Sequence, residues 1–253
     1  MFRLESKSKL RLHPPEFVCD KPIHKQIEPP LPCTHFFMLI LGSAGSGKTS
    51  MLVNLLTSKQ AYKKVFHSVH VIMPSQSVAS LKKNIFKGHP RMHDDLSLLT
   101  LDRIIEKIKI SAEEGHSSLL VMDDVTASLK NKDIQTMLKS LIFNRRHLRT
   151  SIIILAQTYT ALPLPVRKTV SHFIAYSPRN KKEFSSVFEE LVFLEKDTAS
   201  ALQRFVFDKP YTFLYGDVNT HTLYKNFDMI LIKEGDAKGE NQIEKETKEQ
   251  GQA

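Results

Sequence analysis

Short apolar runs alternate with helical patterns through the middle of the chain. The runs that predict buried strands cover residues 36–41, 69–73, 119–122, 152–155 and 170–176. Apolar side chains at helical spacing predict helices over 48–58, 102–114, 131–143 and 180–194. Such an alternation favours a mostly parallel sheet with helical crossovers. We therefore expect an α/β fold with three layers around a central sheet.

The pattern changes near the end of the chain, where two β-rich runs lie close together. Residues 211–215 and 223–232 flank Gly216-Asp217-Val218-Asn219-Thr220, whose composition is typical of a turn. This arrangement predicts a C-terminal β-hairpin in place of a further crossover.

Both ends of the chain differ from the middle. Residues 1–35 are rich in proline and charge, and proline prevents a long helix. We expect a proline-rich N-terminal arm that wraps the core or contacts a neighbour. Residues 233–253 carry almost no apolar side chains, which predicts a disordered charged tail. The predicted domain lies between them, over residues 36–232.

The composition favours a soluble globular protein with an anionic partner. The 253 residues suit one domain, with 41% hydrophobic and 25% charged residues. No apolar run approaches the ~20 residues that cross a bilayer, and the N-terminus lacks the core of a signal peptide. The two cysteines, Cys19 and Cys33, exclude a disulfide framework. A net charge of +9 favours a polyanion such as nucleic acid.

The loop between the first predicted strand and helix carries a phosphate-binding motif. Its residues are Gly42, Ser43, Ala44, Gly45, Ser46, Gly47, Lys48 and Thr49, with Ser50 following in the helix. Glycines let backbone N–H groups and the helix N-terminus point at an anion. Lys48 would then reach the β- and γ-phosphates, and Thr49 would bind Mg²⁺. A chance glycine-rich turn is the alternative, and the order of strand, loop and helix argues against it.

A second motif follows about seventy residues later. The apolar run Leu119-Leu120-Val121-Met122 ends in Asp123-Asp124, which places a carboxylate at the C-terminal end of a central strand. Asp123 would join the Mg²⁺ shell, and Asp124 would polarise a water molecule for attack on the γ-phosphate. Two adjacent acids favour hydrolysis over a switch GTPase or a small-molecule kinase. The alternative is a strand that ends in a solvated turn.

The third motif combines arginines before a strand with a glutamine after it. Arg145, Arg146 and Arg149 precede the strand at 152–155, and Gln157 follows it. Gln157 would bind the γ-phosphate or the attacking water, beside the strand of Asp123. One arginine would neutralise charge on the transferred phosphate, and a solvated helix end is the alternative for each. Further basic clusters at Arg167-Lys168 and Arg179-Lys181-Lys182 would line a polyanion track.

With these three motifs, the chain resembles the genome-packaging ATPases of large DNA viruses, of the poxvirus type, within the FtsK–HerA superfamily. The resemblance spans about residues 36–232. It implies the arginine role for Arg146 and the sensor role for Gln157. It also implies ATP with Mg²⁺, a homo-oligomeric ring, double-stranded DNA, a capsid or portal partner, and location in the host cytoplasm or virion. Many members have Asp-Glu where this chain has Asp123-Asp124, and the shorter Asp124 reaches less far.

Other functions remain open from the sequence. A cellular or conjugative DNA-pumping ATPase of the same superfamily would carry the same motifs. A nucleotide-dependent assembly switch that does not move DNA would also bind ATP, and DNA-stimulated turnover would separate it from a motor. A nucleoside kinase is disfavoured by the paired acids. A GTPase is disfavoured because Asn131-Lys132-Asp133 lacks the N-K-x-D spacing.

Overall fold

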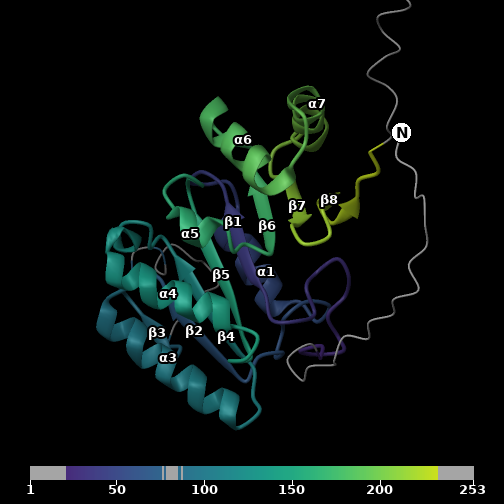
Figure 1. The fold of residues 1–253 in the computed structure, drawn as a ribbon. Helices are drawn as coiled ribbons and strands as arrows, with labels where there is room; N and C mark the ends of the chain where they lie inside the picture. Colours follow the sequence, from purple (N-terminus) through teal and green to yellow (C-terminus); the bar gives the residue numbers. More distant parts are fainter. Residues whose placement is uncertain (1–20, 76, 78–84, 87, 233–253) are drawn as a thin grey trace, which may run out of the picture.

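A mostly parallel sheet forms the centre of the fold, as the alternating pattern predicted (Figure 1). The computed structural model describes residues 21–75, 77, 85–86 and 88–232. Over these residues, the sheet has nine strands in the order β3-β2-β4-β5-β1-β6-β7-β8-β9. The strands are β1 (Phe37–Leu41), β2 (Ser68–Ile72), β3 (Met92–His93), β4 (Ser118–Asp123), β5 (Thr150–Ala156), β6 (His172–Tyr176), β7 (Phe213–Asp217), β8 (Thr222–Lys225) and β9 (Asp228–Met229).

In the order of the sheet, neighbouring strands from β3 through β6 pair in parallel orientation. Neighbouring strands from β6 through β9 pair in antiparallel orientation. The central strands β1, β4 and β5 are buried along their whole length, because helices cover both faces of the sheet. Strand β5 lies between β1 and β4. An additional strand therefore separates the two strands that carry the first two motifs.

Helices on the two faces complete the three layers. The helical segments are α1 (Lys48–Thr57), α3 (Leu98–Glu113), η2 (Ser128–Lys130), α4 (Lys132–Asn144), α5 (Leu164–Arg167), α6 (Lys181–Val187), the π-helical η3 (Phe188–Val192) and α7 (Lys196–Val206). One face of the sheet packs against α3 and α4, through side chains such as Ile104 and Leu138. The opposite face packs against α1 through Leu52 and Leu55.

Capping side chains fix where two long helices begin. Ser97 Oγ accepts a hydrogen bond from Thr100 N at 3.2 Å, so α3 begins at Leu98, four residues before the predicted start. Asn131 Oδ1 accepts from the N–H groups of the first turn of α4. The predicted helix over 180–194 divides into α6 and η3 and ends at Phe193, whose φ is 58°.

The hairpin is present, but its turn differs from the predicted one. Gly216 and Asp217 belong to β7, and the turn lies at residues 218–221. Gly216 pairs with Phe173 of β6, and a Cβ at Gly216 would collide with the Phe173 ring. The glycine therefore serves close packing against β6, and its presence does not mark a turn. Strand β3 and helix α7 were not predicted.

The described part of the N-terminal arm, residues 21–35, lies against the core. Ile27 is buried, Tyr62 Oη donates to Pro32 O at 3.1 Å, and Tyr215 Oη donates to Pro30 O at 2.7 Å. Residues 1–20 of the predicted arm and the predicted tail at 233–253 lie outside the described residues. Among the helices that the structure describes, none has the length and apolar character to cross a bilayer.

Candidate active site

The glycine-rich loop joins the end of β1 to the start of α1. Gly45 and Gly47 have φ angles of +78° and +105°, which L side chains rarely adopt. At Gly42, a Cβ would collide with Ser46 Oγ and lie 3.0 Å from Tyr176 Cβ. The loop is thus curved, and it is tightly packed at Gly42. It ends at the first turn of α1, where backbone N–H groups are unpaired within the helix and favour an anion.

Lys48 folds back over this loop. Its Nζ donates to Gly42 O at 2.6 Å and to Ser43 O at 2.9 Å, and the side chain is buried. Burial lowers the pKa of Lys48, and the charges of Asp123 and Asp124 oppose this shift. The ammonium group therefore lies within the electrostatic field of both acids, as the predicted site requires.

Asp123 ends β4 beside the first turn of α1. Thr49 Oγ1 lies 3.5 Å from Asp123 Oδ2. Burial raises the pKa of Asp123, and the charge of Lys48 opposes this shift. A hydroxyl and one carboxylate fit Mg²⁺, which takes few protein ligands when substrate phosphates complete its shell. Over the described residues, no group of three or more His, Cys, Asp or Glu side chains is placed to hold a metal ion.

Asp124 follows in an unusual backbone conformation. Its φ is +55°, and its side chain is exposed. Asp and Asn enter this region more readily than other side chains, apart from glycine. Strained backbone of this kind persists where the surroundings enforce it, often at functional sites. The acid that would activate water is therefore accessible to solvent at the end of β4.

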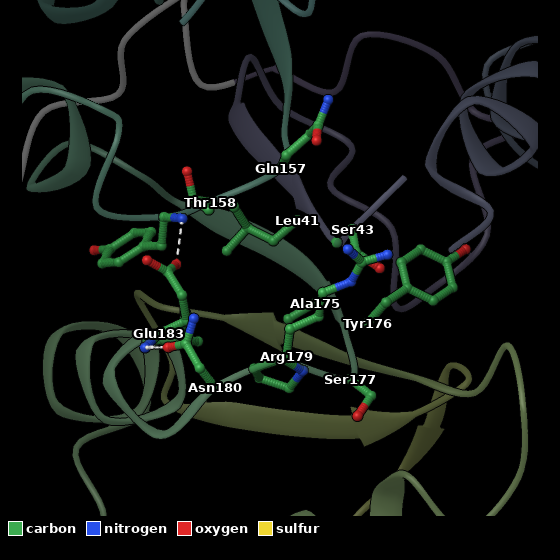
Figure 2. A pocket seen from close by; sticks show the side chains of 14 residues that line it. Leu41, Ser43, Gln157, Thr158, Ala175, Tyr176, Ser177, Arg179, Asn180 and Glu183 are labelled. Carbon is green, nitrogen blue, oxygen red and sulfur yellow. Dashed lines mark hydrogen bonds between the residues drawn. The ribbon is translucent and has the colours of Figure 1, made fainter. Parts of the chain in front are cut away.

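Gln157 reaches the same edge of the sheet because β5 lies between β1 and β4. The loop and the end of β5 are joined directly, since Gly42 N donates to Ala156 O at 3.2 Å. Gln157, Gly42 and Ser43 line one pocket of about 110 Å³ (Figure 2). The structure therefore brings the loop, the acids and Gln157 to one edge of the sheet.

Arg179 also lines this pocket, although the sequence grouped it with Lys181 and Lys182 in a polyanion track. Figure 2 shows its side chain extending from the loop after β6 toward Ser43 and Tyr176. The positive charge of Arg179 also contributes to lowering the pKa of Lys48, after burial. Its position just after a strand could have marked it, because parallel strands end at the ligand-binding edge.

Acids from α6 and η3 hold the segment after Gln157. Glu183 accepts from Tyr159 N at 2.6 Å and from Thr160 Oγ1 at 2.5 Å (Figure 2 draws the first bond). Tyr159 Oη donates to Glu190 Oε2 at 3.0 Å, and Glu190 also pairs with Arg167 at 3.3 Å. Burial and Glu190 raise the pKa of Tyr159. We call this set of five side chains the Tyr159 clamp.

The predicted arginines lie at the opposite edge of the sheet. Arg145, Arg146 and Arg149 precede Thr150, where β5 begins, and the seven residues of β5 extend about 20 Å. Arg145 is half-buried and its Nη1 donates to Ile142 O at 3.0 Å. Arg146 is exposed. The structure does not bring Arg146 to the glycine-rich loop of its own chain.

Comparison with known proteins supports a relation to viral packaging proteins. The profile of the family described as Poxvirus A32 protein matches residues 28–200. The DNA packaging protein OPG160 of Vaccinia virus (strain Copenhagen) is 32% identical over 146 residues, covering 56% of this chain and 53% of that protein. The Monkeypox virus protein of the same description is also 32% identical over 146 residues, covering 48% of its length. The match spans about half the length of these relatives.

Solved structures share the fold. B204, the DNA-packaging ATPase from Sulfolobus Turreted Icosahedral Virus, superposes with a TM-score of 0.58 at 16% identity, over 78% of this chain and 98% of that one. The pCW3 conjugation coupling protein TcpA superposes with a TM-score of 0.52 at 13% identity, over 77% and 58%. At such identities the likeness concerns the fold, and it confirms the predicted α/β fold of the P-loop type.

Proposed function

The chain belongs to the Poxvirus A32 protein family, and on that premise we propose that it is an ATP-hydrolysing motor that moves double-stranded DNA into a viral capsid. The observation that carries the proposal is the meeting of the glycine-rich loop with a strand-end carboxylate. Thr49 Oγ1 lies 3.5 Å from Asp123 Oδ2, and Lys48 and Asp123 shift each other's pKa. The relatives named as DNA packaging proteins support the assignment to packaging.

Binding of the triphosphate follows from the loop. Backbone N–H groups of residues 43–49 and the N-terminus of α1 attract the phosphates. Lys48 Nζ exchanges its bonds to two loop carbonyls for bonds to β- and γ-phosphate oxygens. Thr49 and Asp123 would hold the Mg²⁺ that accompanies ATP, where it neutralises charge on the β- and γ-oxygens. Solved complexes of the related fold contain ATP-gammaS and AMPPCP.

Hydrolysis requires a base and an oriented water molecule. In our proposal, Asp124 accepts a proton from the water as its oxygen attacks the γ-phosphorus. The bond from this phosphorus to the β–γ bridging oxygen breaks, and ADP and phosphate leave. Gln157 donates its amide to the γ-phosphate or accepts from the attacking water. General-base assistance of this kind contributes roughly 10²–10⁴ in rate.

The arginine role requires a second copy of the chain. Arg146 precedes β5 at the edge opposite the glycine-rich loop, so we propose that it acts on the nucleotide of a neighbour in a homo-oligomeric ring. The test mixes Arg146→Ala with Lys48→Ala subunits. Each variant alone should be nearly inactive, while the mixture regains turnover because Lys48→Ala subunits supply Arg146 to intact loops. Normal DNA-stimulated turnover by Arg146→Ala would move the role to Arg145, Arg149 or Arg167.

An ATPase assay with and without duplex DNA, at two salt concentrations, tests the motor itself. A motor that grips phosphates should be stimulated by DNA, and the stimulation should weaken at high salt. An assembly switch would hydrolyse ATP without responding to DNA. We further propose that the motor acts with a capsid or portal protein in the host cytoplasm or virion. A virus that carries Lys48→Ala should then form capsids that lack DNA. DNA-filled capsids in that virus would favour the conjugative or cellular type of pump.

A further inference from the structure

A second pocket lies between α3 and β2. Its volume is about 320 Å³, and its lining includes His70, Arg91, Lys107 and Ser111. None of its lining residues belongs to the pocket that contains Gln157. In the sheet, β4 and β5 separate β2 from β1, which leads into the glycine-rich loop. The pocket is therefore distinct from the candidate active site.

Two buried polar side chains in this pocket have unsatisfied atoms. His70 is only 1% exposed, yet among the described residues neither of its ring nitrogens has a hydrogen-bond partner. Within the same part of the chain, the buried hydroxyl of Ser111 also has none. An unpaired buried polar group costs about 1–3 kcal/mol, so native structures almost always satisfy such groups. Both residues line the pocket, so a molecule bound there is the nearest external source of a partner.

The charges around these groups are mainly positive. Arg91 and Lys107 line the pocket, and over the described residues neither is in a recorded ion pair. Glu114 also lines the pocket, but its carboxylate lies 3.3 Å from His116 Nδ1. Burial, then Arg91 and Lys107, lower the pKa of His70 to about 4. Near pH 7 the neutral imidazole therefore has one ring N–H available to donate, and the two cations give the pocket a positive potential.

We propose that the pocket between α3 and β2 binds a phosphate group. A guanidinium, an ammonium, a hydroxyl and an imidazole N–H offer more donors than the two oxygens of a carboxylate can use. A tetrahedral phosphate accepts from several directions at once, and its charge offsets those of Arg91 and Lys107. The phosphate comes either from the solution or from a nucleic-acid backbone. Phosphate binding in this pocket does not depend on ATP hydrolysis.

The test needs a local readout, because the glycine-rich loop is also expected to take phosphate. Titration of inorganic phosphate, at constant ionic strength in chloride, is followed by the ring resonances of isotope-labelled histidine. The His70 resonance is assigned by its loss in His70→Asn. We expect a saturable shift in the wild type, weakened at least tenfold in Arg91→Gln/Lys107→Gln. The matched control Arg103→Gln/Lys109→Gln also removes two positive charges, from positions of α3 outside the pocket. It should bind inorganic phosphate as tightly as the wild type does.

A variant that keeps the net charge provides a second test in case the double variant fails to fold. Ser111→Ala removes one donor without changing charge, and we expect phosphate to bind about threefold to tenfold more weakly. No shift of the His70 resonance in the wild type would overturn the proposal. Equal weakening in the two double variants would overturn it as well, because it would reflect net charge alone.

Binding of duplex DNA distinguishes the two sources of phosphate. If a backbone phosphate enters the pocket, the slope of log K against log salt should be smaller by about 0.9 in Arg91→Gln/Lys107→Gln than in the control pair. An unchanged slope, together with loss of the inorganic-phosphate shift, assigns the pocket to free phosphate. If Arg91→Gln/Lys107→Gln changes neither the salt slope of DNA binding nor the His70 shift with inorganic phosphate, the proposal is overturned.

Discussion

Replacement of Asp124 by asparagine should separate ATP binding from ATP hydrolysis. Asp124 is exposed, so the change removes no packing. Its φ of +55° is one that asparagine adopts about as readily as aspartate, so the end of β4 should keep its shape. Asp123, which lies beside Thr49, remains in place. The change therefore removes one proton acceptor and little else.

The expected magnitude follows from these facts. Loss of a general base costs roughly 10²–10⁴ in rate, which corresponds to about 3–5 kcal/mol of transition-state stabilisation. Binding should change little, because Asp124 donates nothing to the phosphates. Its negative charge also lies close enough to affect the pKa of both Lys48 and Asp123. Removing this charge relieves repulsion of the triphosphate, so ATP affinity should stay constant or rise.

Two measurements check this expectation. Single-turnover hydrolysis of radiolabelled ATP gives the rate, and equilibrium titration with a fluorescent ATP analogue gives the affinity. The control is Asp102→Asn, which removes an exposed acid from α3 and should leave both values unchanged. A variant whose ATP affinity falls as far as its rate would refute the assigned roles of the two acids. So would a variant that hydrolyses ATP at the wild-type rate.

Three further predictions concern binding and stability. Lys48→Ala should abolish ATP binding or turnover while the fold persists, because the hydrogen bonds of Nζ go to two carbonyls of the loop itself; full ATPase activity would contradict the loop assignment. Arg179→Gln should weaken ATP binding about tenfold, whereas Lys181→Gln, outside the pocket, should not; equal titration curves would remove Arg179 from the site. Burial is the main cause that lowers the pKa of three histidines to about 4: His35, His70 and His172. Because the unfolded chain takes up these protons below its pKa of 6.5, the free energy of unfolding should fall between pH 6.5 and 4, by up to about 1.4 kcal/mol per unit for each histidine; denaturant titrations that give a flat profile would contradict this.

The edge of the sheet that carries the acids was predictable because its determinants are local. Residues 42–49 form one contiguous motif between a strand and a helix, and Asp123 follows directly after an apolar run. The ends of parallel strands meet at one edge, so the two motifs had to converge if both strands entered one sheet. The position of β5 between them is set by strand pairing, because β5 follows both motifs in the sequence.

Other features depend on contacts between distant segments. Arg179 reaches the pocket because β6 pairs with β1, and nothing near Arg179 in the sequence specifies that pairing. Gly216 has the composition of a turn, but the ring of Phe173 places it inside β7. Helix α7 was missed because most of its residues are polar or small, with buried apolar side chains at Leu202 and Val206.

The Tyr159 clamp has a mechanical consequence. The backbone that follows β5 is coupled to two helical segments. Glu183 of α6 accepts a hydrogen bond from its N–H group at Tyr159, and Glu190 of η3 accepts one from the phenol of Tyr159. Two successive helical segments are thereby fastened to the residue that follows Thr158. A displacement of Gln157 at the end of β5 would therefore be transmitted through these hydrogen bonds to α6 and η3, in the outer layer of the molecule.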